Sequence, residues 1–215
     1  MKTKLAFLLI LVSGYSFSQD LPDLKAYSKD IGFNTNFILN GIINSSGSPF
    51  DIMLKKQKTS NTAIRYGTSF YVNLSTNTNT GSNSFYQTNS YSLSVSIGKE
   101  KQNQLSKKWI FYYGGDLAPF YNSYELNYYN SGQIQSNNNN NDFGLRLSPF
   151  LGIRFQITDR LYVGTEALLR LSFSRNEAGW KSYNNATVTA ESSNSFNNLR
   201  FHALPANGIF IFYRF

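Results

Sequence analysis

The residues of this sequence that could carry out chemistry are a single histidine and a set of scattered charges. His202 is the only histidine and there is no cysteine, so a metal site built from imidazole and thiolate ligands has too few members. A catalytic histidine needs a nucleophile within hydrogen-bond reach, and the residue two positions after His202 is Leu204. No glycine-rich phosphate-binding motif follows a strand-like segment. The sequence therefore predicts no cofactor, no metal and no catalytic residue, and it predicts a structural place for His202.

A second group of residues that could carry out chemistry consists of charged side chains, which recur at alternate positions among small and polar residues. A period of two places such side chains on one face of a β-strand, opposite an apolar face. Acids and arginines enclosed on one face must pair or stay hydrated, which predicts an ion-pair network. The group consists of Arg65, Asp116, Arg146, Arg154, Glu166, Arg170 and Arg214.

The elements that must position these charges are segments in which apolar and polar residues alternate. The clearest segment is 89–98, where Tyr91, Leu93, Val95 and Ile97 alternate with serines and a glycine. We predict eight such strands, at 31–43, 50–57, 62–75, 89–98, 108–129, 142–157, 161–174 and 196–215. Four long or polar connections alternate with three shorter ones. The former are 44–49, 76–88, 130–141 and 175–195, and the latter are 58–61, 99–107 and 158–160.

The two faces of these strands differ in bulk, and this difference decides between a soluble and a membrane fold. Alternation alone is also typical of a soluble sandwich or barrel. Here the apolar face carries Trp, Phe, Tyr, Leu and Ile in nearly every strand, which is too much volume for the inside of an eight-stranded ring. We therefore predict an all-β fold, an eight-stranded antiparallel up-and-down transmembrane β-barrel with apolar residues outward. The inward charges would fill the interior and fix the strand register, or they would line a narrow polar channel.

The N-terminus predicts export. Lys2 and Lys4 precede the apolar run 5–12, and small and polar residues follow as far as Ser18-Gln19, which is typical of a cleaved signal peptide over residues 1–18. The run is too short for a transmembrane helix, which needs about 20 residues. We predict a periplasmic lead-in over 19–30 and the barrel over 31–215. Removal of the leader lowers the net charge from +8 to +6, and because the basic residues are scattered, we expect no nucleic-acid partner.

Aromatic residues near the strand ends predict two girdles at the membrane interfaces, where part of each ring is apolar and part is wet. The expected periplasmic girdle is Trp109, Phe111, Tyr162 and Tyr213, and the expected outer girdle is Tyr71, Tyr121, Tyr128 and Phe143.

The leader, the eight alternating segments and the end Tyr213-Arg214-Phe215 resemble small bacterial outer-membrane β-barrel proteins of the OmpA/OmpX type. The Ser18-Gln19 cut and the Asn-rich connections are similar to members of that group from Bacteroidetes. The resemblance implies that Ile211, Tyr213 and Phe215 form the C-terminal signal read by the barrel-assembly machinery. It also implies a location in the outer membrane, among its lipid and lipopolysaccharide.

The resemblance implies a non-enzymatic protein with a structural or adhesion-like role. The alternative is a narrow pore, or an accessory subunit of an envelope transport or secretion system, with an envelope protein as partner. Some small barrels modify lipid A with a histidine, a serine and an acid, so a third hypothesis is such an enzyme with His202 as its base.

Deletion of Phe215 is expected to impair membrane insertion, because it removes the terminal aromatic residue of the predicted assembly signal. Fractionation should then find the protein in the periplasm in a protease-sensitive form. Normal surface levels of the truncated protein would contradict the predicted signal.

Overall fold

The computed structural model describes residues 29–35, 50–78, 83–206 and 208–215. The predicted signal peptide, most of the predicted lead-in, the predicted strand beyond residue 35 and the predicted turn 44–49 lie outside the described residues. Within those ranges the chain forms nine β-strands. They are β1 (Lys29–Asn34), β2 (Phe50–Thr59), β3 (Thr62–Thr78), β4 (Ser84–Gln104), β5 (Trp109–Asn130), β6 (Gln133–Gln156), β7 (Leu161–Asn184), β8 (Thr187–Leu204) and β9 (Ile209–Arg214). A helix with the length and apolar character to cross a membrane is absent from the described part of the chain.

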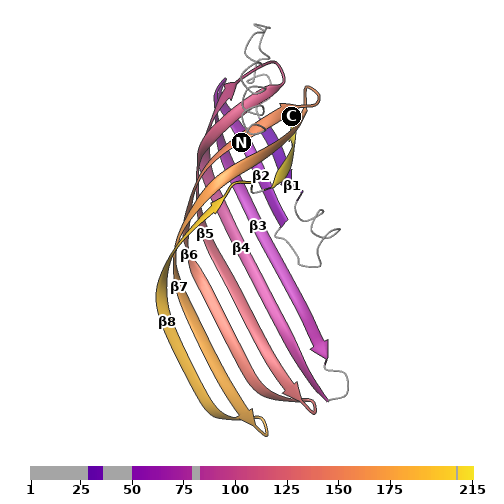
Figure 1. Ribbon diagram of the computed structural model, residues 1–215, viewed down its shortest axis with the longest axis vertical. Coiled ribbons are helices and arrows are strands. Elements are labelled where there is room, and N and C mark those ends of the chain that lie inside the picture. Colours follow the sequence, from indigo (N-terminus) through magenta and orange to yellow (C-terminus); the bar gives the residue numbers. More distant parts are fainter. Residues whose placement is uncertain (1–28, 36–49, 79–82, 207) are drawn as a thin grey trace, which may run out of the picture.

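The described strands close into a ring. Consecutive strands pair antiparallel from β1 to β7, β7 pairs with β9, and β9 pairs with β1. The described part of the chain thus contains a barrel-like ring of eight strands, β1 to β7 and β9 (Figure 1). The remaining strand, β8, pairs with the length of β7 from Leu168 to Asn184. The prediction of an all-β antiparallel fold with eight strands around a closed sheet is confirmed.

The last predicted strand, 196–215, is interrupted. β8 pairs with β7 as far as the couple Leu204 and Leu168, and β9 resumes the pairing at Ile209 with Thr165. Pro205 stands at the start of the break, and proline has no amide hydrogen to donate to a sheet ladder. β8 and β9 therefore occupy successive lengths beside the same neighbour, β7.

The predicted connections 130–141 and 175–195 are wrong, because both are strand. β5 and β6 run on to a turn at Ser131-Gly132, and β7 and β8 run on to a turn at Asn185-Ala186. Most of 76–88 and 99–107 also belongs to β3 and β4. Figure 1 shows the outcome as a long curved sheet that extends from one end of the ring. We call residues 71–78, 84–92, 122–142 and 174–200 the projecting sheet.

Polar pairing between strands explains why these Asn- and Ser-rich stretches are strands. The Asn137 amide donates to Glu125 at 2.8 Å and to Asn127 at 2.7 Å, and the Asn176 amide donates to Asn140 at 2.6 Å. Asparagine and serine favour turns when considered locally. Cross-strand partners supply the stabilisation that the composition alone does not reveal.

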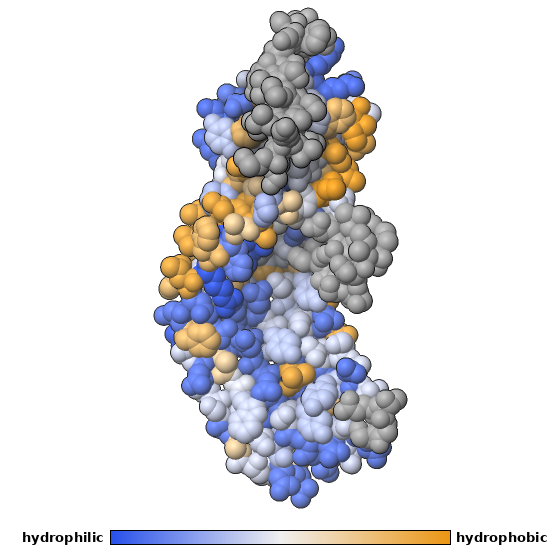
Figure 2. Space-filling view, in the orientation of Figure 1, coloured by the Kyte–Doolittle hydropathy of each residue, from blue (hydrophilic) through white to orange (hydrophobic). Residues whose placement is uncertain are grey.

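The outward direction of the apolar face is confirmed. Leu93, Val95, Leu145 and Leu151 are 47–55% exposed, whereas the largest interior side chains are almost fully buried. The interior hydrophobic residues include Ile110, Tyr112, Tyr162, Phe210 and Phe212. Figure 2 shows apolar residues gathered over the ring and polar residues over the projecting sheet.

Three girdle predictions are wrong, and one of them is Tyr128, which shares the strand parity of the buried Tyr112 and Phe120. Tyr162 is 2% exposed and lies inside the ring, because its position alternates with the partly exposed Leu161 and Val163. Tyr71 lies on the inner face between the exposed Phe70 and Val72. Strand parity therefore decides the face on which these rings lie, and proximity to a strand end does not.

The turn at Asn185-Ala186 yields a stability prediction. Both residues have positive φ, 48° and 63°, which matches a two-residue hairpin turn but disfavours alanine. Ala186→Gly is expected to stabilise this hairpin by roughly 1 kcal/mol, because glycine has no Cβ to collide in this conformation.

Hydrogen exchange of the amides at the end of β7 and the start of β8 should slow correspondingly. Ala190→Gly is the matched control. It lies within β8, opposite Ser182, where glycine should weaken the strand. Equal effects of the two changes would contradict the turn assignment.

Candidate functional site

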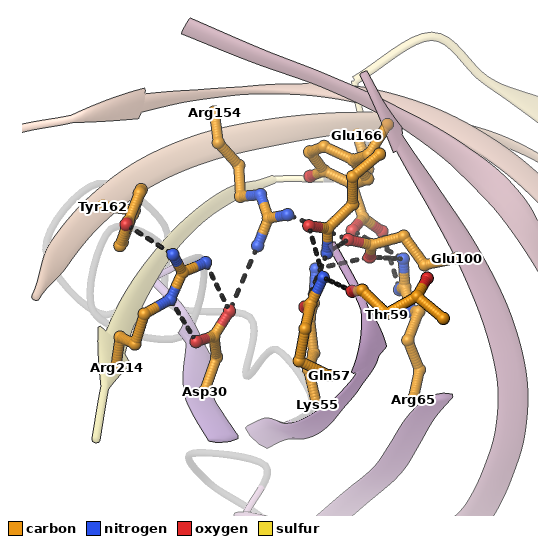
Figure 3. A network of polar contacts seen from close by, with 12 residues as sticks. Asp30, Lys55, Gln57, Thr59, Arg65, Glu100, Arg154, Tyr162, Glu166 and Arg214 are labelled. Carbon is orange, nitrogen blue, oxygen red and sulfur yellow. Dashed lines mark hydrogen bonds and ion pairs between the residues drawn. The ribbon is translucent and has the colours of Figure 1, made fainter. Parts of the chain in front are cut away.

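The interior of the ring holds a network of charges to which each of the eight described ring strands contributes one residue. Four are cations and four are carboxylates, so their formal charges cancel. In chain order they are Asp30, Lys55, Arg65, Glu100, Asp116, Arg154, Glu166 and Arg214, from β1 to β7 and β9. Figure 3 labels all of these residues except Asp116, and the labelled side chains point toward one another from different strands of the ring. We call this set the interior network.

Glu100 lies at the centre of the interior network. Its carboxylate accepts from Lys55 Nζ at 2.6 Å, from Arg154 Nη2 at 2.9 Å and from Arg65 Nη1 at 3.3 Å. The Glu100 side chain is 0% exposed, and its three cationic partners are at most 3% exposed. One carboxylate thus joins β2, β3, β4 and β6 in a region with no access to water.

Two further groups of contacts extend the interior network around the ring. Arg214 binds Asp30 through two bonds of 2.7 and 3.1 Å and donates to Tyr162 Oη at 2.7 Å. Because Asp30 and Arg214 lie on β1 and β9, this contact joins the two strands at which the ring closes. Arg154 bridges Asp30 and Glu100, and so connects this closing contact to the centre (Figure 3).

The second group surrounds Arg65. Arg65 donates to both carboxylate oxygens of Glu166, at 3.0 and 3.1 Å, and contacts Asp116 at 3.2 Å. A two-pronged guanidinium–carboxylate contact is the strongest form of such a pair. Gly98 lies opposite Asp116 in the register, and a Cβ there would collide with the Asp116 carboxylate. The glycine therefore leaves the space that Asp116 occupies.

Aromatic rings fill the remaining space among the charges. Lys55 Nζ lies 4.6 Å from the ring centre of Tyr112 and 4.3 Å from that of Phe212. The Arg65 guanidinium lies 3.7 Å from the ring centre of Phe150. Such contacts stabilise cations that are out of water. Charges and aromatic rings thus pack against one another inside the ring.

The structure brings together five of the seven charges predicted from sequence: Arg65, Asp116, Arg154, Glu166 and Arg214. Arg146 and Arg170 lie along a cavity of about 240 Å³, which Arg65, Asp116 and Glu166 also line, together with Asp51 and several serines. The Arg146 guanidinium packs 4.7 Å from the Phe120 ring centre.

Three members of the interior network, Asp30, Lys55 and Glu100, were not in the predicted set. Glu100 follows Ser94, Ser96 and Gly98 at the same spacing of two, but it falls in a charged stretch that was interpreted as a connection. Asp30 falls in the predicted lead-in, although β1 begins at Lys29. Continuing the alternation past the predicted strand bounds finds Asp30 and Glu100, whereas Lys55 lies within the predicted strand 50–57 at an inward position.

The other predicted residues have the following places. Ile211, Tyr213 and Phe215 are 41–52% exposed on the outer face at the chain end, and the backbone of Phe215 pairs with that of Lys29. Their role as an assembly signal stays a prediction. His202 is exposed on β8, opposite Arg170. Among the described residues, no group of three or more His, Asp or Glu side chains could hold a metal ion.

Neither a protein-family model nor a characterised protein matches the sequence.

Glu100→Gln is expected to lower the free energy of unfolding by about 3–5 kcal/mol, because it leaves three buried cations without their shared carboxylate. The measurement is urea unfolding of the detergent-folded protein, followed by tryptophan fluorescence. Glu177→Gln is the matched control. Its partner Arg175 lies at 3.1 Å, but both side chains are about half exposed, so the change should cost less than about 1 kcal/mol. Similar losses for the two variants would contradict the central place of Glu100.

Proposed function

We propose that this protein is an integral outer-membrane β-barrel, similar to the OmpA/OmpX type, whose ring anchors the projecting sheet at the cell surface. Its role on this proposal is structural or adhesion-like, and it is not an enzyme. Its surroundings would be outer-membrane lipid and lipopolysaccharide, and the barrel-assembly machinery would insert it.

The observation that carries the proposal is the apolar outer face of the ring. On β7 the outward residues from Val163 to Phe173 span eleven positions, and on β6 those from Phe143 to Ile153 span eleven. A strand needs about 9–11 residues to cross a bilayer. Large apolar side chains at 41–58% exposure on this face are costly in water and stable against acyl chains.

On β6 and β7 the apolar face ends where the projecting sheet begins. On β7 the outward residue after Phe173 is Arg175, which is paired with Glu177. On β6 the outward residue beyond Phe143 is Asn141. These changes on two neighbouring strands support a membrane boundary at this level, with the polar sheet in water beyond it.

The arrangement of the chain ends supports an orientation. The described start of β1, the C-terminus and the short connection 157–160 lie at the end of the ring away from the projecting sheet (Figure 1). In outer-membrane barrels the short turns face the periplasm and the long excursions face outward. The projecting sheet would then be the part that meets the exterior.

The interior network argues against a conducting role, since paired charges and aromatic rings occupy the inside of the ring. In planar bilayers the protein should therefore be silent. A conductance that changes on Glu166→Gln or Arg170→Ala would favour the narrow pore, and a stoichiometric envelope partner would favour the accessory subunit. Altered lipid A that depends on His202 would favour the enzyme.

Leu147→Arg tests the membrane assignment. Leu147 is 49% exposed and pairs with Leu117 and Leu171 in the middle of the apolar face. An arginine near the bilayer midplane costs about 2–4 kcal/mol, so the amount of protein in the outer-membrane fraction should fall. Ser193→Arg adds the same charge at an exposed position of the projecting sheet and should leave that amount unchanged. Equal amounts of the two variants would count against the proposal that the apolar outer face lies in the membrane. A wild-type protein that stays soluble without detergent would also count against it.

A further inference from the structure

A row of polar side chains crosses the inner face of the projecting sheet. Its members lie opposite one another in the strand register from β3 to β7, and they are Tyr71, Ser92, Asn122, Asp142 and Asn176. With Arg200 of β8 they line a cleft of about 320 Å³. This volume is at the small end of the range for ligand sites, which is about 300–1,000 Å³. We call these five residues the polar row.

Two oxygen atoms of the polar row are buried without a partner. Asp142 is 6% exposed and Asn176 is 3% exposed, yet Oδ1 of each has no hydrogen bond. The two residues are neighbours in the register, and both line the cleft. A buried acceptor without a donor is costly, which indicates that a ligand or water supplies the missing hydrogen bonds.

Neither side chain is free to turn away. Asp142 Oδ2 accepts from Arg200 Nη1 at 3.1 Å, across the intervening strand β7. Asn176 Nδ2 donates to Asn140 Oδ1 at 2.6 Å. In each residue one side-chain atom is held by a hydrogen bond, and the other, Oδ1, is left for a ligand. Fixing the side chain before binding makes the arrangement preorganised.

The charges and donors of the cleft define the ligand. Asp142 and Arg200 neutralise each other, so this pair favours neither an anion nor a cation. The Asn122 Oδ1 atom accepts from the Ser92 hydroxyl at 2.6 Å, which directs the Asn122 amide group to other partners. A suitable ligand therefore carries neighbouring hydroxyl groups that both donate and accept. The Tyr71 ring at the end of the row offers an apolar surface beside them.

We propose that the polar row binds a short neutral saccharide. Adjacent ring hydroxyls would donate to Asp142 Oδ1 and Asn176 Oδ1, and one would accept from the Asn122 amide. The C–H face of a sugar ring would lie against Tyr71. This inference deepens the proposed surface role, on which it rests, because it names the class of molecule that the projecting sheet meets.

The test is binding of the mature protein, refolded in detergent, to a printed panel of neutral mono- to tetrasaccharides and a second panel of sulfated and sialylated ones. We expect retention on the neutral panel. Asn176→Ala and Asn122→Ala should each weaken binding on the order of tenfold, because each removes hydrogen bonds to the sugar hydroxyls. Asn197→Ala is the matched control. It removes the same side chain from the outer face of β8, opposite Arg175, and should bind as the wild type does.

Three results would overturn the inference: no retention on either panel by protein that circular dichroism shows to be folded, preference for the anionic panel, or unchanged binding by both row variants. The assay uses detergent-folded protein, so its outcome does not depend on cellular location. A protein that reaches the outer membrane but binds no saccharide would disprove this inference alone, and failure to reach that membrane would disprove the proposed function.

Discussion

The structure depends on one constraint, which is that a ring of eight strands encloses too little space for hydrated ions. A charge that is buried inside must therefore be paired with an opposite charge, as it is at the level of the interior network. Glu100 meets this requirement for three cations at once, and Arg214 with Asp30 meets it where β1 and β9 close the ring. Buried ion pairs add little net stability over apolar packing, but a broken pair is costly. The interior network thus opposes strand registers other than the observed one.

The same alternation of side chains has different consequences at the two ends of the molecule. Around the ring, the outward positions are leucines and aromatic residues, and the inward ones are charges and rings. Beyond Phe143 and Phe173 the outward positions become polar, and asparagines and serines form bonds across the inner face. An apolar exterior with a filled interior suits an anchor, whereas a polar sheet with a lined cleft suits recognition. The proposed function assigns these two roles to the two ends.

Sequence reasoning predicted the strand faces better than the strand ends. Periodicity is a local property, so Leu93 and Leu151 could be assigned to the outer face from their neighbours alone. Strand ends depend on pairing partners, and the Asn-rich stretch 137–141 looks like a loop until Glu125, Asn127 and Asn176 are placed beside it. Glu100 and Asp30 were missed for the same reason, because each lies just outside the predicted bounds of its strand. Pro205 was visible in the sequence, but its effect appears only as a break in the ladder with β7.

The sequence by itself determined that the fold is all-β, that bulky apolar residues face outward and that arginines and acids face inward. These properties follow from the alternation of side chains along a single strand, which requires no knowledge of its neighbours. Only the tertiary structure decided which charges meet, because Asp30 and Arg214 are far apart in the chain and become adjacent when the ring closes. The structure likewise decided that Arg146 and Arg170 stay outside the interior network and that five residues from five strands form the polar row. Both outcomes depend on the register between strands, which no single strand encodes.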